Sequence, residues 1–310
     1  MTFFKNNSCE FKNPVVAMGT FDGVHLGHRK LLTDLKQKAK EIGGESIVIT
    51  YYHHPLETIH KKTFPYLLTE KDEKEKLLKE FTDCVLYLNF SDEMAQMSAF
   101  DFLNEILLKE IKAKHLIVGY DTHFGYKREG NYEFLMSHKD KLNFDVDLTE
   151  PYKIQNRIVS SSLIRDLIRE GNVQETSEFL GRNYSVFGKV VKGHRIGREI
   201  GFPTINIVPD DPYKLIPAIG VYVCEVMVNN HKFSGVTNIG YSPTLKEVSV
   251  KEIETFIIDF DEDIYDENVE VIFRKRLRDE IHFKSKEELV KKISEDVREA
   301  REFFGKRLKK

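Results

Sequence analysis

The chain has 310 residues, of which 41% are hydrophobic and 31% charged, and its 47 basic and 50 acidic residues leave a formal net charge of −3. This composition is typical of a globular protein and excludes a disordered or fibrous chain. Charge is balanced in both halves of the chain, which argues against broad binding to the phosphate backbone of a nucleic acid. At roughly 150 residues per domain, the length favours two domains.

No apolar run reaches the roughly 18–20 residues that span a bilayer. Residues 1–7 lack the apolar core and the cleavage site of a signal peptide. The three cysteines, Cys9, Cys84 and Cys224, lie far apart without metal-site spacing, as expected for reduced thiols. We therefore expect a cytoplasmic protein that acts on neither membranes nor nucleic acids. The sequence leaves its oligomeric state open.

Apolar strands alternate with amphipathic helices in the first half of the chain. Strands are expected at 15–18, 46–50, 84–88 and 115–119, and helices from about 27 to 42, after a cap at Thr69, and along a face made by Phe100, Leu103, Leu107 and Leu108. This alternation predicts a parallel sheet covered by helices on both faces. Ligands of such sheets bind at the carboxyl ends of the strands, so the residues after Met18, Thr50 and Val118 are the first candidates for a site.

The pattern changes after a linker expected at 178–183, around Gly181. Strand-like segments follow at 185–191, 220–226, 255–259 and 269–273, with Asn229-Asn230 as a hairpin turn and no helix signal between the strands. One helix is expected from about 285 to 304. These features predict an antiparallel β-barrel with a C-terminal helix, and domains at residues 1–182 and 183–310.

The sharpest motif joins the first strand to the first helix and reads Gly19-Thr-Phe-Asp-Gly-Val-His-Leu-Gly-His28. Gly27 lets the backbone approach a phosphate closely, and the amides at a helix start attract an anion. His25 and His28 are three residues apart at this turn, so both imidazoles can stabilise charge that develops during phosphoryl transfer. The alternative is two histidines that face solvent beside a helix start.

This motif resembles the nucleotidyltransferase signature of the bacterial bifunctional riboflavin kinase/FMN adenylyltransferase family, also called FAD synthetases. Residues 117–130 resemble the family's Val-Gly-x-Asp-Phe-x-Phe-Gly-x-x-Arg-x-Gly segment, and residues 160–165 resemble its Ser-Ser-Thr-x-Ile-Arg segment. The resemblance implies a Rossmann-like FMN adenylyltransferase domain that binds nucleotide through Gly19, Phe21, Asp22, Gly27, Asp121, Ser160, Ser161 and Arg165. The alternative is that these residues have only structural roles: Asp121 lies in an ordinary turn, Ser160 and Ser161 cap a helix, and Arg165 faces solvent.

A second constellation lies in the predicted barrel. Thr204-x-Asn206 offers two oxygen ligands on one strand edge, which suits a Mg²⁺ that bridges ATP phosphates. Glu254 enters an apolar strand and can deprotonate a primary alcohol that attacks a phosphate. The alternatives are a polar strand face and an edge-strand glutamate facing water, and Glu252 is a second candidate for the base. Glycines at 188, 193 and 197 permit close phosphate approach, although barrel glycines are usually turns and bulges.

Residues 188–207 resemble the riboflavin kinase signature Gly-x-Val-x-x-Gly-x-x-x-Gly-Arg-x-x-Gly-Phe-Pro-Thr-Ala-Asn, and residues 235–245, 254–260 and 277–283 resemble further segments of the same family. The resemblance implies a kinase domain that phosphorylates riboflavin with ATP to give FMN, after which the first domain transfers AMP from a second ATP to FMN, giving FAD and pyrophosphate. It assigns nucleotide binding to Gly188, Gly193, Gly197 and Arg198, flavin binding to Phe202, Pro203 and Arg278, Mg²⁺ to Thr204 and Asn206, and the base to Glu254.

The sequence departs from the family pattern at a few positions. Tyr52 stands at an acidic position, Thr122 replaces an aromatic residue, and Ser242 replaces an arginine. The first two departures motivate one alternative, a kinase-dominant protein with weak adenylyltransferase activity. The other alternative joins a nucleotidyltransferase fold to a β-barrel that only binds RNA or a partner protein. The near-neutral charge of the barrel and its spaced oxygen ligands argue against that second alternative.

Overall fold

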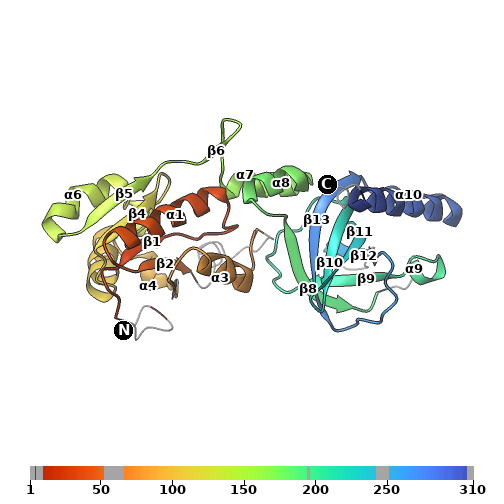
Figure 1. Cartoon of the computed structure of the whole chain (residues 1–310), viewed down its shortest axis with the longest axis horizontal. Coiled ribbons are helices and arrows are strands. Elements are labelled where there is room, and N and C mark those ends of the chain that lie inside the picture. Colours follow the sequence, from red (N-terminus) through yellow and green to blue (C-terminus); the bar gives the residue numbers. More distant parts are fainter. Residues whose placement is uncertain (1–3, 5–9, 52–65, 194–195, 242–250, 306–310) are drawn as a thin grey trace. The chain divides into compact units, whose positions relative to one another are not determined.

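The computed structural model describes Phe4 and residues 10–51, 66–193, 196–241 and 251–305, without the side chains of Ile196 and Arg198. The chain divides into two compact units, Met1–Ser161 and Ser162–Lys310, which run from red to yellow-green and from green to blue in Figure 1. Within the described ranges, no helix is both long enough and apolar enough to cross a membrane.

The first unit is built on a five-stranded parallel sheet, as predicted. The strand order is β3-β2-β1-β4-β5, with β1 at Val15–Met18, β2 at Ser46–Tyr51, β3 at Cys84–Leu88, β4 at His115–Gly119 and β5 at Asp145–Thr149. The order reverses between β1 and β4. The carboxyl ends of these two strands therefore flank the position at which ligands bind in open α/β sheets.

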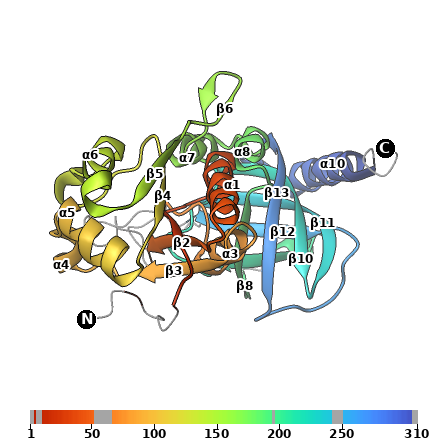
Figure 2. The same cartoon turned by 60° about the vertical axis from the view of Figure 1, so that its left-hand side comes forward.

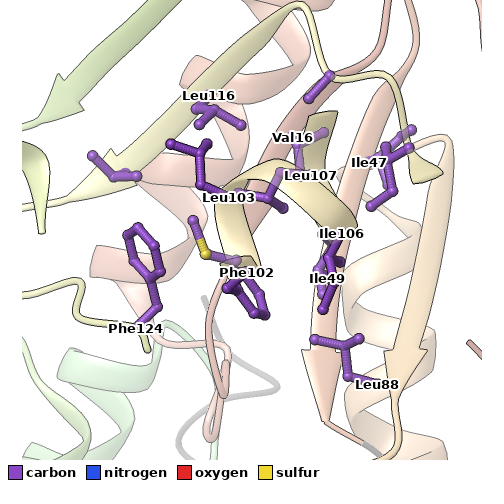
Figure 3. Close-up of a cluster of buried hydrophobic side chains, with 14 of the residues drawn as sticks. Val16, Ile47, Ile49, Leu88, Phe102, Leu103, Ile106, Leu107, Leu116 and Phe124 are labelled. Atoms are coloured by element: carbon purple, nitrogen blue, oxygen red, sulfur yellow. The ribbon is translucent and has the colours of Figure 1, made fainter. Parts of the chain in front are cut away.

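Side chains of the sheet contribute to two apolar cores, one on each face, because successive residues of a strand point to opposite faces. On one face, helices α1 (Leu26–Glu41) and α3 (Lys71–Lys79) pack against Val15, Ala17, Val48 and Ile117. On the other face lies the π-helical segment η1 (Phe102–Glu110), whose apolar side chains meet Val16, Ile47, Ile49 and Leu116 (Figure 3). Both faces of the sheet are thereby covered, which leaves the strand ends for a site.

The segment η1 corrects one prediction. An α-helix with 3.6 residues per turn was expected from the spacing of Phe100, Leu103, Leu107 and Leu108. In η1 the backbone hydrogen bonds instead span five residues, as from Ile111 N–H to Ile106 O at 3.1 Å. The segment buries Phe102, Leu103, Ile106 and Leu107, whereas Phe100, which lies before it, is 41% exposed. Two short helices, α4 (Asp92–Ala95) and α5 (Ala99–Asp101), precede it.

Several elements of the first unit had no clear sequence signal. They are β5, the single turn η2 (Tyr126–Arg128), helix α6 (Tyr132–Leu142) and a small hairpin of β6 (Lys153–Ile154) and β7 (Arg157–Ile158), whose strand β6 is labelled in Figure 2. The hairpin turns at Gln155 and Asn156, with φ of 49° and 64°. The edge strand β5 mixes exposed and buried residues, so it lacks the continuous apolar run by which the other strands were recognised.

The second unit contains a closed six-stranded antiparallel barrel, as predicted. Its strand order is β10-β11-β12-β9-β8-β13, with β8 at Ser185–Val191, β9 at Thr204–Pro209, β10 at Gly220–Val228, β11 at His231–Tyr241, β12 at Lys251–Ile257 and β13 at Asn268–Arg278. The predicted hairpin turn is confirmed, since Asn229 and Asn230 join β10 to β11 with φ of 48° and 64°. A short helix, α9 (Ile196–Glu199), lies between β8 and β9, where none was expected.

Small polar side chains occupy part of the barrel interior. Thr237 Oγ1 lies 2.9 Å from Thr255 Oγ1 and 3.0 Å from Cys224 Sγ, and all three residues are fully buried. Burial raises the pKa of Cys224 to about 12, so this thiol stays protonated. The three groups satisfy one another, and the interior is a packed core.

The C-terminal helix α10 (Lys286–Gly305) covers part of the outer wall of the barrel, packing Ala300, Val297 and Phe303 on Val221, Val223 and Val236. Arg278 donates from Nε and Nη2 to both carboxylate oxygens of Asp296, at 2.7–3.1 Å, and Asp296 is 4% exposed. This bidentate pair ties α10 to β13. Arg278, which was predicted to bind flavin, therefore has a structural role in this fold.

Helices α7 (Ser161–Glu170) and α8 (Val173–Leu180) pack with the barrel, apart from Ser161. Ala218 N–H donates to Ile168 O at 3.1 Å, and a Cβ on Gly171 would lie 2.8 Å from the Tyr222 hydroxyl oxygen. The expected linker at 178–183 begins within α8, and Gly181 ends that helix with a φ of 70°. The division of activities between residues 1–182 and 183–310 stays a prediction.

Candidate active sites

Two imidazole rings lie together where β1 joins α1. His25 is the N-cap of α1, and its Nδ1 accepts a hydrogen bond from the His28 backbone N–H at 3.2 Å. The two rings stack with their centroids 3.6 Å apart and their planes at 14°. Because Nδ1 of His25 accepts, the neutral ring carries its proton on Nε2, the nitrogen that can then donate to a phosphoryl oxygen. The structure thus brings the two predicted histidines together.

The loop that carries the histidines has an unusual backbone. Phe21 and Val24 have φ of 48° and 38°, a region that β-branched residues such as valine rarely enter. Both side chains are buried, and the Phe21 ring meets the His28 ring edge-on with centroids 5.2 Å apart. Such strain persists only where the surrounding structure enforces it. This geometry favours support of the His28 ring as the role of Phe21, which was predicted to bind nucleotide.

Asp22 is buried in the same loop and accepts hydrogen bonds from a neighbouring segment. Its carboxylate accepts from the Leu68 backbone N–H at 2.9 Å, and from the Thr69 backbone N–H at 3.1 Å and hydroxyl at 3.2 Å. Only 2% of Asp22 is exposed. For this residue too, which was predicted to bind nucleotide, the geometry favours a role inside the loop.

The segment before α7 packs directly on the histidine loop. A Cβ on Gly27 would lie 3.1 Å from Val159 O and 3.2 Å from the His25 ring, so only glycine fits without movement. Ser161 Oγ donates to Asp22 O at 2.8 Å, and Ser160 lies half-buried beside it. A Cβ on Gly19 would touch the Phe21 ring at 3.4 Å. Arg165 lies on the part of α7 that belongs to the second unit, and its phosphate-binding role stays a prediction.

Asp121 follows β4, at the same edge of the sheet as the histidine loop. It is exposed, and a carboxylate at this position can accept from a hydroxyl of a ribose or a flavin tail. Thr122, which departs from the family pattern, accepts from the Gly119 backbone N–H through Oγ1 at 2.9 Å and so shapes the turn. Partial burial, together with the nearby Asp121 carboxylate, raises the pKa of Tyr120.

In the barrel unit, the predicted metal ligands and the predicted base lie on neighbouring strands of the barrel wall. Asn206 on β9 pairs directly with Glu254 on β12, and Glu254 pairs with Asn238 on β11. Thr204 lies two residues before Asn206 and therefore shares its face. These four side chains are half-buried, whereas Thr255, which follows Glu254, points into the closed interior. A carboxylate thus lies in one row with two amides.

A glycine-rich segment lies over this row. A Cβ on Gly193 would collide with Asn206 Nδ2, and a Cβ on Gly197 would collide with Phe202 O and approach Thr204 Oγ1 to 3.2 Å. Gly188 is a packing glycine, because its Cβ would collide with the Val208 backbone on the neighbouring strand β9. Two of the three predicted glycines therefore lie against the predicted metal ligands.

We expect Gly193→Ala to lower the rate of riboflavin phosphorylation about 100-fold, because the new methyl group displaces Asn206 or the loop by an ångström or more. FMN adenylylation is expected to stay within about twofold, since the change lies in the other unit. Flavin chromatography of timed reactions measures both rates. Gly305→Ala, whose Cβ meets open space, is the matched control. A Gly193→Ala protein with wild-type kinase turnover would contradict the placement of this loop.

Two hollows adjoin the barrel site. The first, of about 370 Å³, is lined by Thr204 and Pro203, by apolar residues that include Val190 and Ile257, and by the loop from Phe260 to Tyr265. The second, of about 570 Å³, lies between Glu199 and Ile200 on one side and residues 281–286 with Leu289 on the other. Phe283 lines the second hollow, and the Arg278 guanidinium lies 6.0 Å from its ring centroid. Sequence reasoning had not located either hollow.

Phe202 contributes to the same region through its ring, which meets the Phe256 ring edge-on with centroids 5.3 Å apart. Pro203, the next residue, is exposed at the mouth of the first hollow. Some predicted positions lie outside the described residues: Tyr52 with residues 53–55, Ser242 with residues 243–245, and the side chain of Arg198.

Sequence reasoning missed three residues that shape these sites. Thr69 was predicted to cap a helix, but the N-cap of α3 is Glu70, and the Thr69 hydroxyl bonds the histidine loop instead. Lys74 on α3 donates to Tyr51 O at 3.3 Å and reaches Thr20 O at 3.5 Å, which links the ends of β1 and β2. Burial raises the pKa of Tyr51. Asn238 lies within a recognised motif, yet nothing local indicated its pairing with Glu254.

An imidazole pair at the switch point of a parallel sheet, and a threonine, asparagine and glutamate row on a β-barrel, define a two-unit transferase of phosphoryl and nucleotidyl groups. Two family models match the chain, FAD synthetase over residues 8–163 and riboflavin kinase over residues 180–304. A bifunctional riboflavin kinase/FMN adenylyltransferase of Listeria monocytogenes is 34% identical over 95% of this chain and 93% of its own length. The Escherichia coli protein of the same name is 34% identical over 94% and 93%. The chain belongs to the bifunctional riboflavin kinase/FMN adenylyltransferase family.

A solved structure shares the whole architecture. The crystal structure of a Streptococcus pneumoniae protein described as a macrolide-efflux protein matches with a TM-score of 0.85 and 31% sequence identity, covering 94% of both chains. The description of that protein names transport, whereas both family models and the curated relatives name flavin chemistry. The chemistry of the side chains described above agrees with the flavin family.

Proposed function

We propose that this protein makes FAD from riboflavin in two ATP-dependent steps. In the first, the ribityl 5′-hydroxyl attacks the γ-phosphorus of ATP, the bond to ADP breaks, and FMN forms. In the second, an FMN phosphate oxygen attacks the α-phosphorus of another ATP, and pyrophosphate leaves. One observation carries the proposal: each unit gathers its own set of polar side chains suited to one of the two transfers.

Glu254 is the proposed base of the kinase step. A primary alcohol is a weak nucleophile, so a carboxylate that accepts its proton as the new bond forms accelerates the transfer. The direct register of Glu254 with Asn206 supports this role, because it places the acid beside a proposed ligand of the Mg²⁺ that accompanies ATP. Glu252 shares the face but pairs with Gly240, away from Asn206.

Thr204 and Asn206 are the proposed Mg²⁺ ligands. Their oxygen atoms suit Mg²⁺, which prefers a few protein oxygens together with water and substrate phosphates. Among the described residues, no group of three or more histidine, cysteine, aspartate or glutamate side chains can hold a metal ion. A threonine and asparagine pair beneath a glycine loop fits an ion that arrives with ATP. When bound, the ion would neutralise charge on the phosphates.

His25 and His28 are the proposed catalytic pair of the adenylyl transfer. The FMN phosphate is already a nucleophile, so this step needs stabilisation of developing charge more than it needs a base. Hydrogen bonding of His25 Nδ1 leaves Nε2 as a donor, and the N-terminal amides of α1 add partial positive charge. Asp121, Ser160 and Ser161 are proposed to bind nucleotide around this pair. Arg165 on α7 is proposed to bind phosphate.

The two hollows beside the barrel row are the proposed substrate pockets of the kinase. The hollow lined by Thr204 is the proposed ATP pocket, because it places the proposed metal ligand beside the apolar side chains of Val190 and Ile257. The hollow lined by Phe283 suits the flat flavin ring, and the Arg278 guanidinium lies 6.0 Å from the centroid of that phenylalanine ring. Phe202 and Pro203 do not line this hollow, and their contact with flavin stays a prediction. We place both reactions in the cytoplasm, where ATP is abundant.

Incubating the protein with riboflavin, ATP and Mg²⁺ and separating the flavins by chromatography tests the proposal. FMN is expected first and FAD second, and EDTA is expected to stop both. Accumulation of FMN without FAD would instead support the kinase-dominant alternative that Tyr52 and Thr122 motivate. Absence of any flavin conversion would overturn the proposal in favour of a binding module.

A further inference from the structure

The histidine loop is held from outside by the residues that lead into and begin α3. These residues, which we call the α3 latch, are Leu68, Thr69 and Lys74. The Leu68 backbone N–H donates to both oxygens of Asp22, at 2.9 and 3.2 Å, and Leu68 and Thr69 are 1% and 3% exposed. Leu68 and Thr69 therefore make buried hydrogen bonds, shielded from competition with water.

The hydroxyl of Thr69 makes two of these bonds at once. It donates to Asp22 Oδ1 at 3.2 Å and accepts from the Gly23 backbone N–H at 2.9 Å. These partners lie between Phe21 and Val24, the two residues with positive φ. A single hydroxyl thus spans the strained turn and stabilises its conformation.

Lys74 restrains the start of the same loop. Its Nζ donates to Tyr51 O at 3.3 Å and lies 3.5 Å from Thr20 O. The loop is therefore restrained before and after Phe21, and His25 follows two residues after Gly23. A shift of the turn between these points would be passed on to both stacked imidazoles.

We propose that Thr69 is a positioning residue for adenylyl transfer, which acts through Asp22 and Gly23 on His25 and His28. The inference rests on the proposed function of the two histidines. Catalytic groups must be held within roughly 0.5 Å of their productive geometry, and a 1 Å misplacement can cost about 100-fold in rate. The Thr69 hydroxyl bonds both residues between the two positive-φ positions of the loop, and it adds to the restraints from Leu68 and Lys74.

Thr69→Val removes the hydroxyl and keeps the shape of the side chain. We expect kcat for conversion of FMN to FAD to fall about 10- to 100-fold, with KM for FMN within about threefold, because positioning affects the transition state more than substrate binding. Thr69→Ser keeps the hydroxyl and is expected to restore kcat to within about threefold of wild type. Riboflavin phosphorylation, measured in the same full-length protein, is expected to stay unchanged.

Thr82→Val is the matched control. Thr82 is also buried, and its hydroxyl donates to Ser46 O at 2.7 Å, at the start of β2 and hence at the opposite end of the strands. This variant is expected to lower the midpoint of thermal unfolding about as much as Thr69→Val, but to leave kcat for FAD formation unchanged. If Thr69→Val fails to fold, Thr69→Ala, which also lacks the hydroxyl, tests the same restraint, with an expected fall in kcat of about 10- to 100-fold.

Wild-type kcat in Thr69→Val, or equal defects in Thr69→Ser and Thr69→Val, would overturn the positioning role. His28→Ala separates this failure from failure of the proposed function. If His28→Ala stops FAD formation while Thr69→Val has no effect, only the positioning role is wrong. If His28→Ala also retains FAD formation, the proposed function of the histidines is wrong.

Discussion

Replacing His28 by alanine is expected to lower the conversion of FMN to FAD by about 100- to 1,000-fold, while riboflavin phosphorylation keeps its wild-type rate. The size follows from the loss of one preorganised donor to charge that develops in the transition state. His28 also stacks on His25 at 3.6 Å between ring centroids, so its removal loosens the second imidazole. Timed chromatography with FMN as substrate, and separately with riboflavin, measures the two activities.

His138→Ala is the matched control for that experiment. His138 lies on α6 in the same unit, outside the histidine loop, and its Nδ1 contacts Phe134 O at 2.8 Å. Both activities of this variant are expected to equal those of wild type. A folded His28→Ala protein that loses both activities, or neither, would show that the imidazole pair does not serve one separate transfer.

Glu254→Gln is expected to have the opposite effect. Riboflavin phosphorylation should fall about 100- to 10,000-fold, the range typical for loss of a general base, and FMN adenylylation should continue. Glutamine keeps the size of the side chain and one acceptor oxygen, and the pairing of β12 with β9 and β11 is made by the backbone, so the pairing is retained. A measured loss therefore reports the missing carboxylate and not a disturbed barrel.

Glu252→Gln distinguishes the two acidic candidates on β12. Both residues lie on the same face of the strand, but Glu252 is opposite Gly240, whereas Glu254 is opposite Asn206. We expect Glu252→Gln to retain at least about half of the kinase rate. A large loss of kinase activity in Glu252→Gln, with normal turnover in Glu254→Gln, would show that Glu252 is the base.

The strands with continuous apolar runs could be predicted from the sequence. The ranges expected for β1, β3 and β4 agree with the structure, because runs of apolar residues differ sharply from their polar flanks. The range expected for β8 also agrees, although Lys189 interrupts its apolar residues. The edge strand β5 lacks such a run, and η1 has a wider turn than the helical period that was assumed. The missed elements are therefore those with a mixed or unusual pattern.

The candidate site could be predicted where its residues lie in short motifs, as His25 and His28 do. The partners of these residues could not, because they come from distant parts of the chain. Thr69 bonds Gly23 across 46 positions, and Lys74 reaches Thr20 across 54. No local pattern reports such contacts, since they depend on how α3 packs on the sheet.

Neighbouring side chains of β12 point to opposite faces of the barrel wall and have different roles. Thr255 is fixed among Thr237 and Cys224, while Glu254, one position earlier, faces the proposed chemistry. Because alternate side chains leave a strand in opposite directions, inward positions of β12 determine the packing of the barrel core, whereas Glu254 on the outer face can be changed without altering that core. A one-residue insertion in this strand would exchange the two sets, disabling catalysis and core together.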